Sequence, residues 1–215
     1  NIKTPITRWN GSEIVISSDD LARESLLILY HNGNVLTRLL GTPGDERELF
    51  FGHLVSEGYL EHSKLNIESE FEIHVNEFGA HEIHLVGQEL KQKSSSPERI
   101  IKSSCGACDA DGLEELIYDL PILDIDSRKI DFSNLNKSFE DMKLKQKGFS
   151  STGGMHAAGI IDFDYNLLSV KEDIGRHNAV DKVIGDGIIK KIKFEDSILM
   201  LSGRCGWDIV AKACR

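Results

Sequence analysis

The most informative block for the fold is Glu172-Asp173-Ile174-Gly175-Arg176-His177-Asn178-Ala179-Val180-Asp181-Lys182. An apolar segment typical of a strand, residues 167–170, precedes it, and apolar residues at helical spacing follow it up to residue 188. A strand that turns at a glycine into an amphipathic helix indicates a sheet covered by helices. A solvated helix start would explain the acidic residues but not the Arg-His-Asn triplet. The block therefore also predicts a binding site, in which the guanidinium of Arg176 would hold a phosphate or a carboxylate.

The sequence around this block continues the alternation of strands and helices. Residues 198–201 predict a buried strand, and residues 206–213 predict the helix that follows it. Upstream, residues 159–170 predict a hairpin, and the apolar spacing at 135–142 predicts a further helix. We therefore expect residues 99–215 to form an α/β domain.

The first part of the chain, residues 1–98, predicts a β-rich subdomain with one helix. A hairpin over residues 26–40 would turn at Asn32-Gly33, and residues 71–86 predict a second strand pair. Between them, Thr42-Pro43 suits the cap and first residue of a helix that ends at Gly58. The polar stretch 91–98 has the composition of a linker, which places the domain boundary there.

Composition and charge exclude several classes of protein. The chain has 215 residues, of which 40% are hydrophobic, so it can fill a core and wholesale disorder is excluded. Its net charge of -10 opposes general binding to nucleic acid. No apolar run is long enough to cross a membrane, and no signal peptide opens the sequence. We therefore expect a cytoplasmic protein whose four cysteines are reduced.

The first chemical motif is Cys105-Gly106-Ala107-Cys108. Two thiols on a turn of small residues can reach each other, a metal or an incoming sulfur, and a following helix would favour the thiolate. Half a zinc site, a redox dithiol and two structural cysteines are the alternatives. A zinc site needs a second pair at similar spacing, which Cys205 and Cys214 do not supply, so we expect no metal. A nucleophilic or sulfur-carrying loop is the better interpretation.

Two further turns could bind an anion. Gly153-Gly154 permits positive φ angles and exposed amide groups, and His156 follows as a donor, although a Gly-Gly turn before a strand is more often structural. Ser202-Gly203-Arg204 follows a predicted strand at the edge where α/β sheets bind ligands. A buried free thiol is the commoner case for Cys205. The chain has no Walker loop and no Gly-x-Gly-x-x-Gly after a strand, so kinase and Rossmann dehydrogenase functions lack support.

Taken in order, these motifs resemble those of the formate dehydrogenase accessory sulfurtransferase family, FdhD/NarQ. The likeness covers residues 26–212 and includes Thr42-Pro43-Gly44-Asp45-Glu46, the cysteine loop and the three turns. It implies a cytidine deaminase-like three-layer core and a homodimer. It also implies that a cysteine desulfurase loads a persulfide on Cys105, with Cys108 as its relay or resolving partner. A mobile persulfide is well suited to thiolate exchange.

The resemblance further implies the substrate. The sulfur would pass to the bis-guanylated molybdopterin cofactor, with Mo or W, before that cofactor enters formate dehydrogenase, and GDP or GTP would serve as a surrogate ligand. A non-catalytic chaperone for the same cofactor is the alternative. Cationic and amide donors would hold the guanylate arms, and the residues expected to do so are Gly153, Gly154, His156, Asp173, Arg176, His177, Asn178, Ser202, Gly203 and Arg204.

The chain departs from the family pattern in three places. Asp109 stands where a second glycine is common, and its carboxylate would oppose ionisation of Cys108, so the thiolate role falls on Cys105. Cys205-Gly206-Trp207-Asp208 replaces a small residue followed by a glutamate. Family chains continue beyond the point that matches Arg215, so we expect a truncated C-terminus. Unlike in cytidine deaminases, alanines follow His156, which leaves no His-x-Glu for a zinc site.

Overall fold

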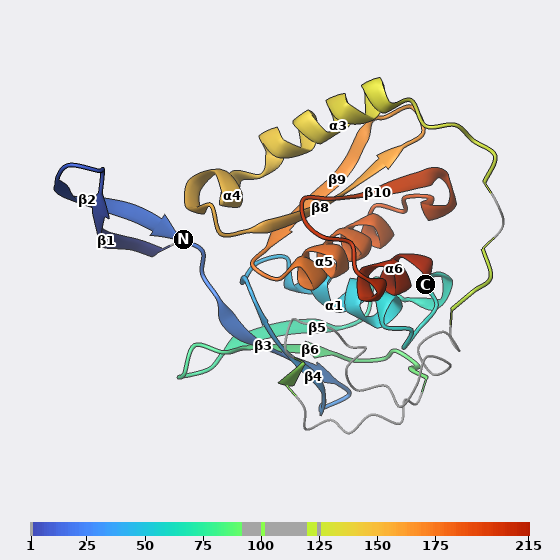
Figure 1. Ribbon diagram of the computed structural model, residues 1–215. Helices are drawn as coiled ribbons and strands as arrows, with labels where there is room; N and C mark the ends of the chain where they lie inside the picture. Colours follow the sequence, from blue (N-terminus) through green and yellow to red (C-terminus); the bar gives the residue numbers. More distant parts are fainter. Residues whose placement is uncertain (1, 92–99, 102–119, 124–125) are drawn as a thin grey trace.

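The computed structural model describes residues 2–91, 100–101, 120–123 and 126–215, which form a mixed α/β fold with three sheets (Figure 1). Helices and sheets alternate in space, because each sheet has an apolar face that needs a cover. The predicted α/β class is confirmed. No helix in the described ranges is long and apolar enough to cross a membrane.

The larger sheet has five strands in the order β5-β6-β3-β4-β7. The predicted first hairpin is confirmed, because Asn32 and Gly33 adopt φ angles of 48° and 79° between two antiparallel strands. The second predicted strand pair is also present, and it joins the first in parallel. The strands are β3 (Ser25–His31), β4 (Asn34–Gly41), β5 (Phe71–Val75), β6 (His81–Leu85) and β7 (Ile100–Ile101).

A second sheet, called the smaller sheet below, also lies in the body of the molecule. It has three strands in the order β10-β8-β9. They are β8 (His156–Asp162), β9 (Leu167–Asp173) and β10 (Ser197–Leu201). The central strand, β8, is antiparallel to both neighbours, so β9 and β10 run in the same direction and end at the same edge. A helix follows each of them, α5 (Arg176–Ile189) after β9 and α6 (Trp207–Cys214) after β10. Both helices therefore begin at one edge of the sheet.

The layers follow from the core clusters. Met142 of α3 (Phe132–Lys145) packs on the outer face of the smaller sheet, and α5 covers its inner face (Figure 1). This part forms three layers, helix on sheet on helix. Beyond α5 lies α1 (Glu46–Ser56), which covers the larger sheet with the buried side chains of Leu49, Phe50 and Leu54. Two short 3-10 turns, His62–Lys64 and Phe194–Asp196, complete this part of the chain.

The two central helices touch through their backbones. A Cβ atom built on Gly185 of α5 would lie 1.9 Å from the carbonyl oxygen of Glu48, and one built on Gly52 of α1 would lie 1.7 Å from that of Asp181. Neither position has room for a side chain, because real Cβ atoms do not approach other atoms so closely. Two glycines therefore allow α1 and α5 to hold the two sheets together.

A buried ionic cluster fastens α6 to both central helices. The Lys212 ammonium lies 2.8 Å from Asp181 of α5 and 2.5 Å from Glu57 at the end of α1. The second Asp181 oxygen accepts a hydrogen bond from Lys212 at 3.1 Å and lies 3.1 Å from Nδ1 of His53, and Ser56 donates its hydroxyl proton to Asp181. Burial raises the pKa of Asp181, but Lys212 and the hydrogen bond with His53 outweigh burial and hold it below its ordinary value.

The predicted start of α1 is wrong. The helix begins at Glu46, after Asp45 in the left-handed conformation, and not at Pro43. Thr42 does not cap it, because the Thr42 hydroxyl accepts a hydrogen bond from the backbone of Ile174 at 3.1 Å. The predicted stop is confirmed, since Gly58 follows the last helical turn with a φ angle of 71°. Thr42 and Pro43 thus belong to a loop that meets the start of α5.

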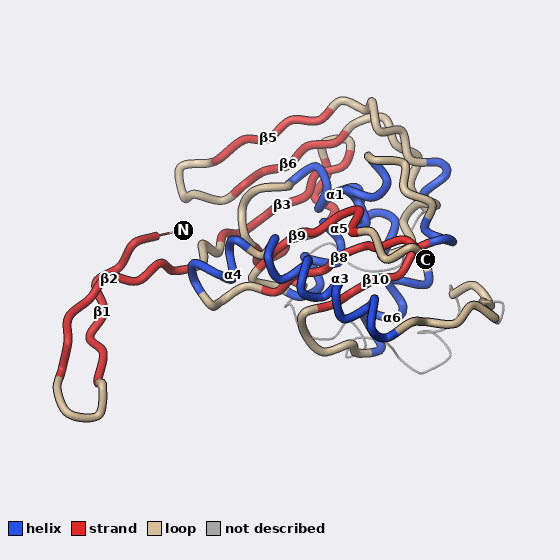
Figure 2. Tube along the Cα trace, turned by 90° about the horizontal axis from the view of Figure 1, so that it is seen from above, coloured by secondary structure: helices blue, strands red, loops and turns tan. Residues whose placement is uncertain are grey.

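Sequence reasoning missed the N-terminal hairpin of β1 (Ile2–Trp9) and β2 (Ile14–Leu21). Its eight cross-strand pairs join it only to itself, and it extends away from the rest of the molecule (Figures 1 and 2). The turn begins with Asn10-Gly11, a signal that could have predicted it. Short α4 (Lys147–Thr152), beside β2, was also not predicted.

Candidate functional site

The predicted turns meet at the edge where β9 and β10 end. His156 pairs with Asp173 across the β8–β9 ladder, and Leu201 pairs with Ala158 across β8–β10. Just beyond, the amide of Ala157 donates a hydrogen bond to the Ser202 hydroxyl at 2.8 Å. The structure therefore brings the Gly-Gly-Met-His, Gly-Arg-His-Asn and Ser-Gly-Arg turns together, although they lie far apart in the sequence.

The histidine of the first turn lies against the third turn. A Cβ atom on Gly203 would approach Nδ1 of His156 to 3.1 Å, so glycine leaves room for the imidazole ring. The positive φ expected of the Gly-Gly pair occurs at Gly153, which ends α4 with a φ of 67°. Gly154 does not adopt a positive φ, and a Cβ atom built on it would lie 3.7 Å from that of Ala22.

Two side chains at the start of α5 contact an acid at the start of α6. Nε2 of His177 hydrogen-bonds Oδ2 of Asp208, and the Arg176 guanidinium lies 3.6 Å from the same oxygen. Burial raises the pKa of Asp208, but the hydrogen bond with His177 and the charges beside it outweigh burial and lower that pKa. Nδ1 of His177 and Nε of Arg176 are buried without a hydrogen-bond partner in the described part of the chain. The pair therefore keeps unused hydrogen-bonding capacity beside this edge, with the Arg176 Nε–H as a donor.

Asp208 is the residue that the predicted site lacked. The sequence offered one signal, an acid in the first turn of the helix after Ser-Gly-Arg, where it complements the helix dipole. Its pairing with His177 spans 31 residues and could not be deduced from spacing.

Asp173 and Asn178 are committed to internal contacts. The fully buried Asp173 carboxylate accepts hydrogen bonds from the backbone of Thr42 at 2.9 Å and of Gly175 at 2.8 Å, and it also lies 2.8 Å from the Lys182 ammonium. Asn178 donates to Asp173 at 3.1 Å and to the Leu40 carbonyl at 2.9 Å. These bonds fix the turn that presents Arg176 and His177. A direct contact of Asp173 or Asn178 with a ligand stays a prediction.

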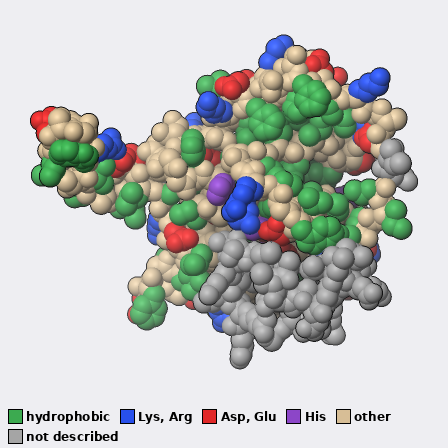
Figure 3. Space-filling view, viewed as in Figure 1, with side chains coloured by type: hydrophobic (Ala, Val, Ile, Leu, Met, Phe, Trp, Pro, Cys, Tyr) green, Lys and Arg blue, Asp and Glu red, His purple; other side chains and the backbone are tan. Residues whose placement is uncertain are grey.

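The third turn is open to solvent. Ser202, Gly203, Arg204 and Cys205 are all exposed, because the chain leaves the sheet at Leu201 and turns back only at α6. The prediction of a buried Cys205 is therefore wrong. In the space-filling view, a histidine and basic side chains lie side by side near the middle of this face (Figure 3).

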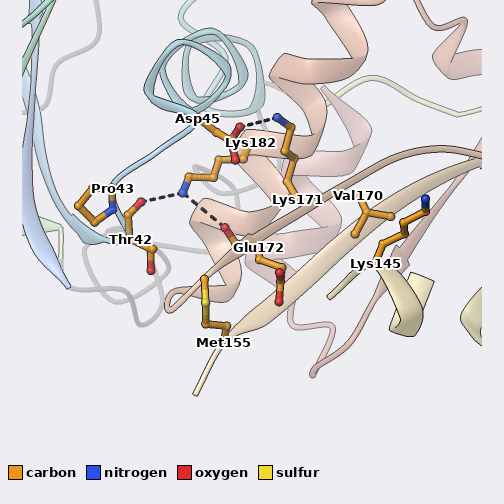
Figure 4. A pocket seen from close by; sticks show the side chains of 9 residues that line it. All are labelled: Thr42, Pro43, Asp45, Lys145, Met155, Val170, Lys171, Glu172 and Lys182. Atoms are coloured by element: carbon orange, nitrogen blue, oxygen red, sulfur yellow. Dashed lines mark hydrogen bonds and ion pairs between the residues drawn. The ribbon is translucent and has the colours of Figure 1, made fainter. Parts of the chain in front are cut away.

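A cavity of about 380 Å³ lies behind these turns, between the loop before α1 and strand β9 (Figure 4). Lys171 extends into it but pairs with Asp45 at 2.6 Å and Glu48 at 2.9 Å. Burial would lower the pKa of Lys171, but these hydrogen bonds outweigh it and raise the pKa. Two of the three lysines in the wall are thus already paired. The lining residues are Thr42, Pro43, Asp45, Lys145, Met155, Val170, Lys171, Glu172 and Lys182.

The cysteine loop, with Cys105 and Cys108, lies outside the described residues. Within the described ranges, no three His, Cys, Asp or Glu side chains are grouped so that they could hold a metal ion. What the described edge offers is two arginines, two histidines and amide groups, the donor types that bind phosphate.

A solved structure shares the fold. It is a crystal structure from Desulfotalea psychrophila, described as a candidate formate dehydrogenase accessory protein, which matches with a TM-score of 0.73 and 21% identity. The match covers 100% of this chain and 79% of the other. At this identity the likeness concerns the fold alone.

The sequence comparisons give the family. A protein of Picrophilus torridus named sulfur carrier protein FdhD is 35% identical over 205 residues, which cover 92% of this chain and 75% of that protein. A protein of the same name from Sulfolobus acidocaldarius is 33% identical over 99% of this chain and 80% of its own length. The sequence model of the FdhD/NarQ family matches residues 22–215. The chain therefore belongs to the FdhD/NarQ family.

Proposed function

We propose that this protein is a sulfur carrier that passes persulfide sulfur from a cysteine desulfurase to the bis-guanylated molybdopterin cofactor of formate dehydrogenase. The observation that carries the proposal is family membership over residues 22–215, together with relatives named sulfur carrier protein FdhD. Three turns with hydrogen-bond donors lie together at one sheet edge. This supports the part of the proposal that concerns binding of the cofactor, its ligand half. The family likeness also supports a cytoplasmic homodimer.

The sulfur step uses the two thiols of the cysteine loop. The Cys105 thiolate attacks the terminal sulfur of the desulfurase persulfide, forms a new S–S bond and releases the desulfurase thiolate. The Cys108 thiolate then attacks the inner sulfur of the Cys105 persulfide. That attack forms a Cys105–Cys108 disulfide and releases hydrosulfide, so the dithiol supplies the two electrons that reduce the sulfur. A cellular dithiol reductant regenerates the thiols.

The ligand step uses the sheet edge. Arg176 and Arg204 provide guanidinium groups for the phosphates of the guanylate arms, and exposed amides of the glycine turns add hydrogen bonds. Asp208 holds the imidazole of His177 in one orientation beside Arg176. The contacts of Asp173 with Asn178 and Lys182 hold the turn that carries the Arg176 and His177 side chains.

Replacing Cys105 by alanine is expected to abolish sulfur loading. When the wild-type protein is incubated with a cysteine desulfurase and cysteine, its mass should rise by about 32 Da, one sulfur atom. The Cys105→Ala variant should show no such adduct, while the matched Cys205→Ala variant should still load. An adduct retained in Cys105→Ala would assign the acceptor role to another thiol and contradict the proposed step.

Formate dehydrogenase activity separates the carrier from a simple cofactor chaperone. A carrier needs its thiols, so cells with a Cys105→Ala/Cys108→Ala variant should have inactive formate dehydrogenase. Full activity with that double variant would favour the non-catalytic chaperone.

GDP is expected to protect the protein against thermal unfolding, because a ligand of the native state must stabilise it. At a hundredfold excess over the dissociation constant, the melting temperature should rise by about 6 °C. Arg204→Ala and Arg176→Ala should lose this shift, whereas Arg8→Ala on the N-terminal hairpin should retain it. Equal protection of all three variants would remove these arginines from the ligand site.

A further inference from the structure

We propose that the indole of Trp207 is the surface on which the guanine ring of the ligand stacks. This inference rests on the proposed function and names the part of the site that recognises the base. Trp207 is the first residue of α6, three residues after Arg204 of the Ser-Gly-Arg turn that would hold the phosphates. Its side chain is 41% exposed, which leaves much of an unusually large aromatic surface open.

The helix fixes where this ring lies. Consecutive residues of an α-helix point about 100° apart. Asp208 points toward His177 and Arg176 of α5, and Ile209 is buried in the core with 1% exposure. Trp207, one step before Asp208 and two steps before Ile209, therefore projects to solvent beside the Asp208 contacts. The helices α5 and α6 meet here (Figure 1), and the Arg176 guanidinium lies 3.6 Å from Asp208, the residue that follows Trp207 in the chain.

The local packing holds this first turn in place. Gly206 caps the helix without a side chain, and a Cβ there would lie 2.5 Å from Oδ1 of Asp208. At the other end, Lys212 anchors α6 to Asp181 and Glu57. The backbone that carries Trp207 is therefore held in place, which limits the entropy that is lost when a base stacks on the ring.

The chemistry suits a nucleobase. Every base has a flat π-face, and a tryptophan beside cationic groups binds the base while the cations bind the phosphates. Removing one stacking partner typically weakens binding about tenfold or more. A phosphate group alone gains nothing from the indole, so the two halves of the site can be tested separately.

The chain has two tryptophans, and the other one, Trp9, lies on the N-terminal hairpin. In a Trp9→Phe background, Trp207 is therefore the sole tryptophan, and its emission can be excited selectively over that of the four tyrosines. GDP should quench its emission, and inorganic pyrophosphate should not. In the same background, Trp207→Leu should weaken GDP binding about tenfold in thermal-shift titrations, and Trp207→Phe should restore most of it. The unliganded melting temperature should hardly change, because the side chain is exposed.

The outcomes distinguish the two proposals. If Trp207→Leu binds GDP as tightly as its parent, and GDP does not quench Trp207, the stacking inference is overturned while the nucleotide site stands. If the parent protein binds neither GDP nor pyrophosphate, the ligand half of the proposed function fails and the inference fails with it. Sulfur loading of the Trp207→Leu variant should be unchanged in every case, and its loss would show that the residue acts on the sulfur step instead.

Discussion

Gly185→Ala is expected to destabilise the protein by at least about 3 kcal/mol and to lower its melting temperature by at least about 7 °C. The new methyl carbon would lie 1.9 Å from the Glu48 carbonyl oxygen, so α1 and α5 must move apart. That movement loosens the core on both sides, because each helix also packs on its own sheet. A loss of this size is a large share of the 5–15 kcal/mol that stabilises an ordinary domain.

Gly187→Ala is the matched control, because it lies one half-turn further along the same helix. The atoms nearest to its new methyl group belong to the ring of Phe194, at 2.8 Å, and a side chain can shift where a backbone cannot. Alanine also has a higher helix propensity than glycine, by about 1 kcal/mol. Urea and thermal unfolding of the two variants measure the difference. Equal losses would mean that the backbone contact between α1 and α5 does not decide the stability.

Lys212→Met is expected to cost about 3–5 kcal/mol at neutral pH, because it leaves the Asp181 carboxylate buried without its cation. In the wild-type protein the pKa of Asp181 is lowered, so its contribution to stability is present above the unfolded pKa of about 3.9 and is lost as the pH falls through the folded pKa. Without Lys212, burial should raise this pKa above its ordinary value. The stability of the variant should then be lost as the pH rises through the folded pKa.

The pH dependence therefore gives Lys212→Met a signature that a simple packing defect lacks. The penalty relative to wild type should be smaller near pH 5 than near pH 8. Adding Asp181→Asn to Lys212→Met should recover part of the stability at pH 8, because the unpaired charge is gone. Lys143→Met, on an exposed position of α3, should change little. A penalty that is the same at both pH values would contradict this account.

Local sequence signals predicted a helix or a turn correctly where its geometry depends on residues close together in the sequence. Asn32-Gly33 supplied the positive φ angles of its hairpin, and the apolar spacing of residues 179–188 predicted α5. The spacing indicated one apolar face, whereas α5 is buried on all sides, including Asp181 and Lys182, because it lies between the two sheets. The start of α1 was missed because Thr42 is recruited by Ile174 and Asp173, partners 132 and 131 residues away. A capping propensity cannot compete with contacts that only the folded chain provides.

The candidate site shows the same division. Sequence order named Arg176, His177 and Arg204, and the structure places their turns at one edge of the smaller sheet. The sequence could not show that the Asp173 side chain is buried. A carboxylate in a motif can bind a ligand or hydrogen-bond within the protein, and the sequence does not distinguish these two roles. Nor could it pair Asp208 with His177, because that contact depends on β8 lying between the two strands whose helices meet.

The contact between α1 and α5 has a consequence for how the sequence of such a protein can change over generations. When two side chains collide, a second substitution that makes one of them smaller can relieve the collision. At Gly52 and Gly185 the obstacle is a carbonyl group, which every amino acid carries. No second-site substitution at Glu48 or Asp181 can clear it. These two glycines are thus constrained by the backbone itself, whereas the side chains of Glu48 and Asp181 are constrained only by their ion pairs.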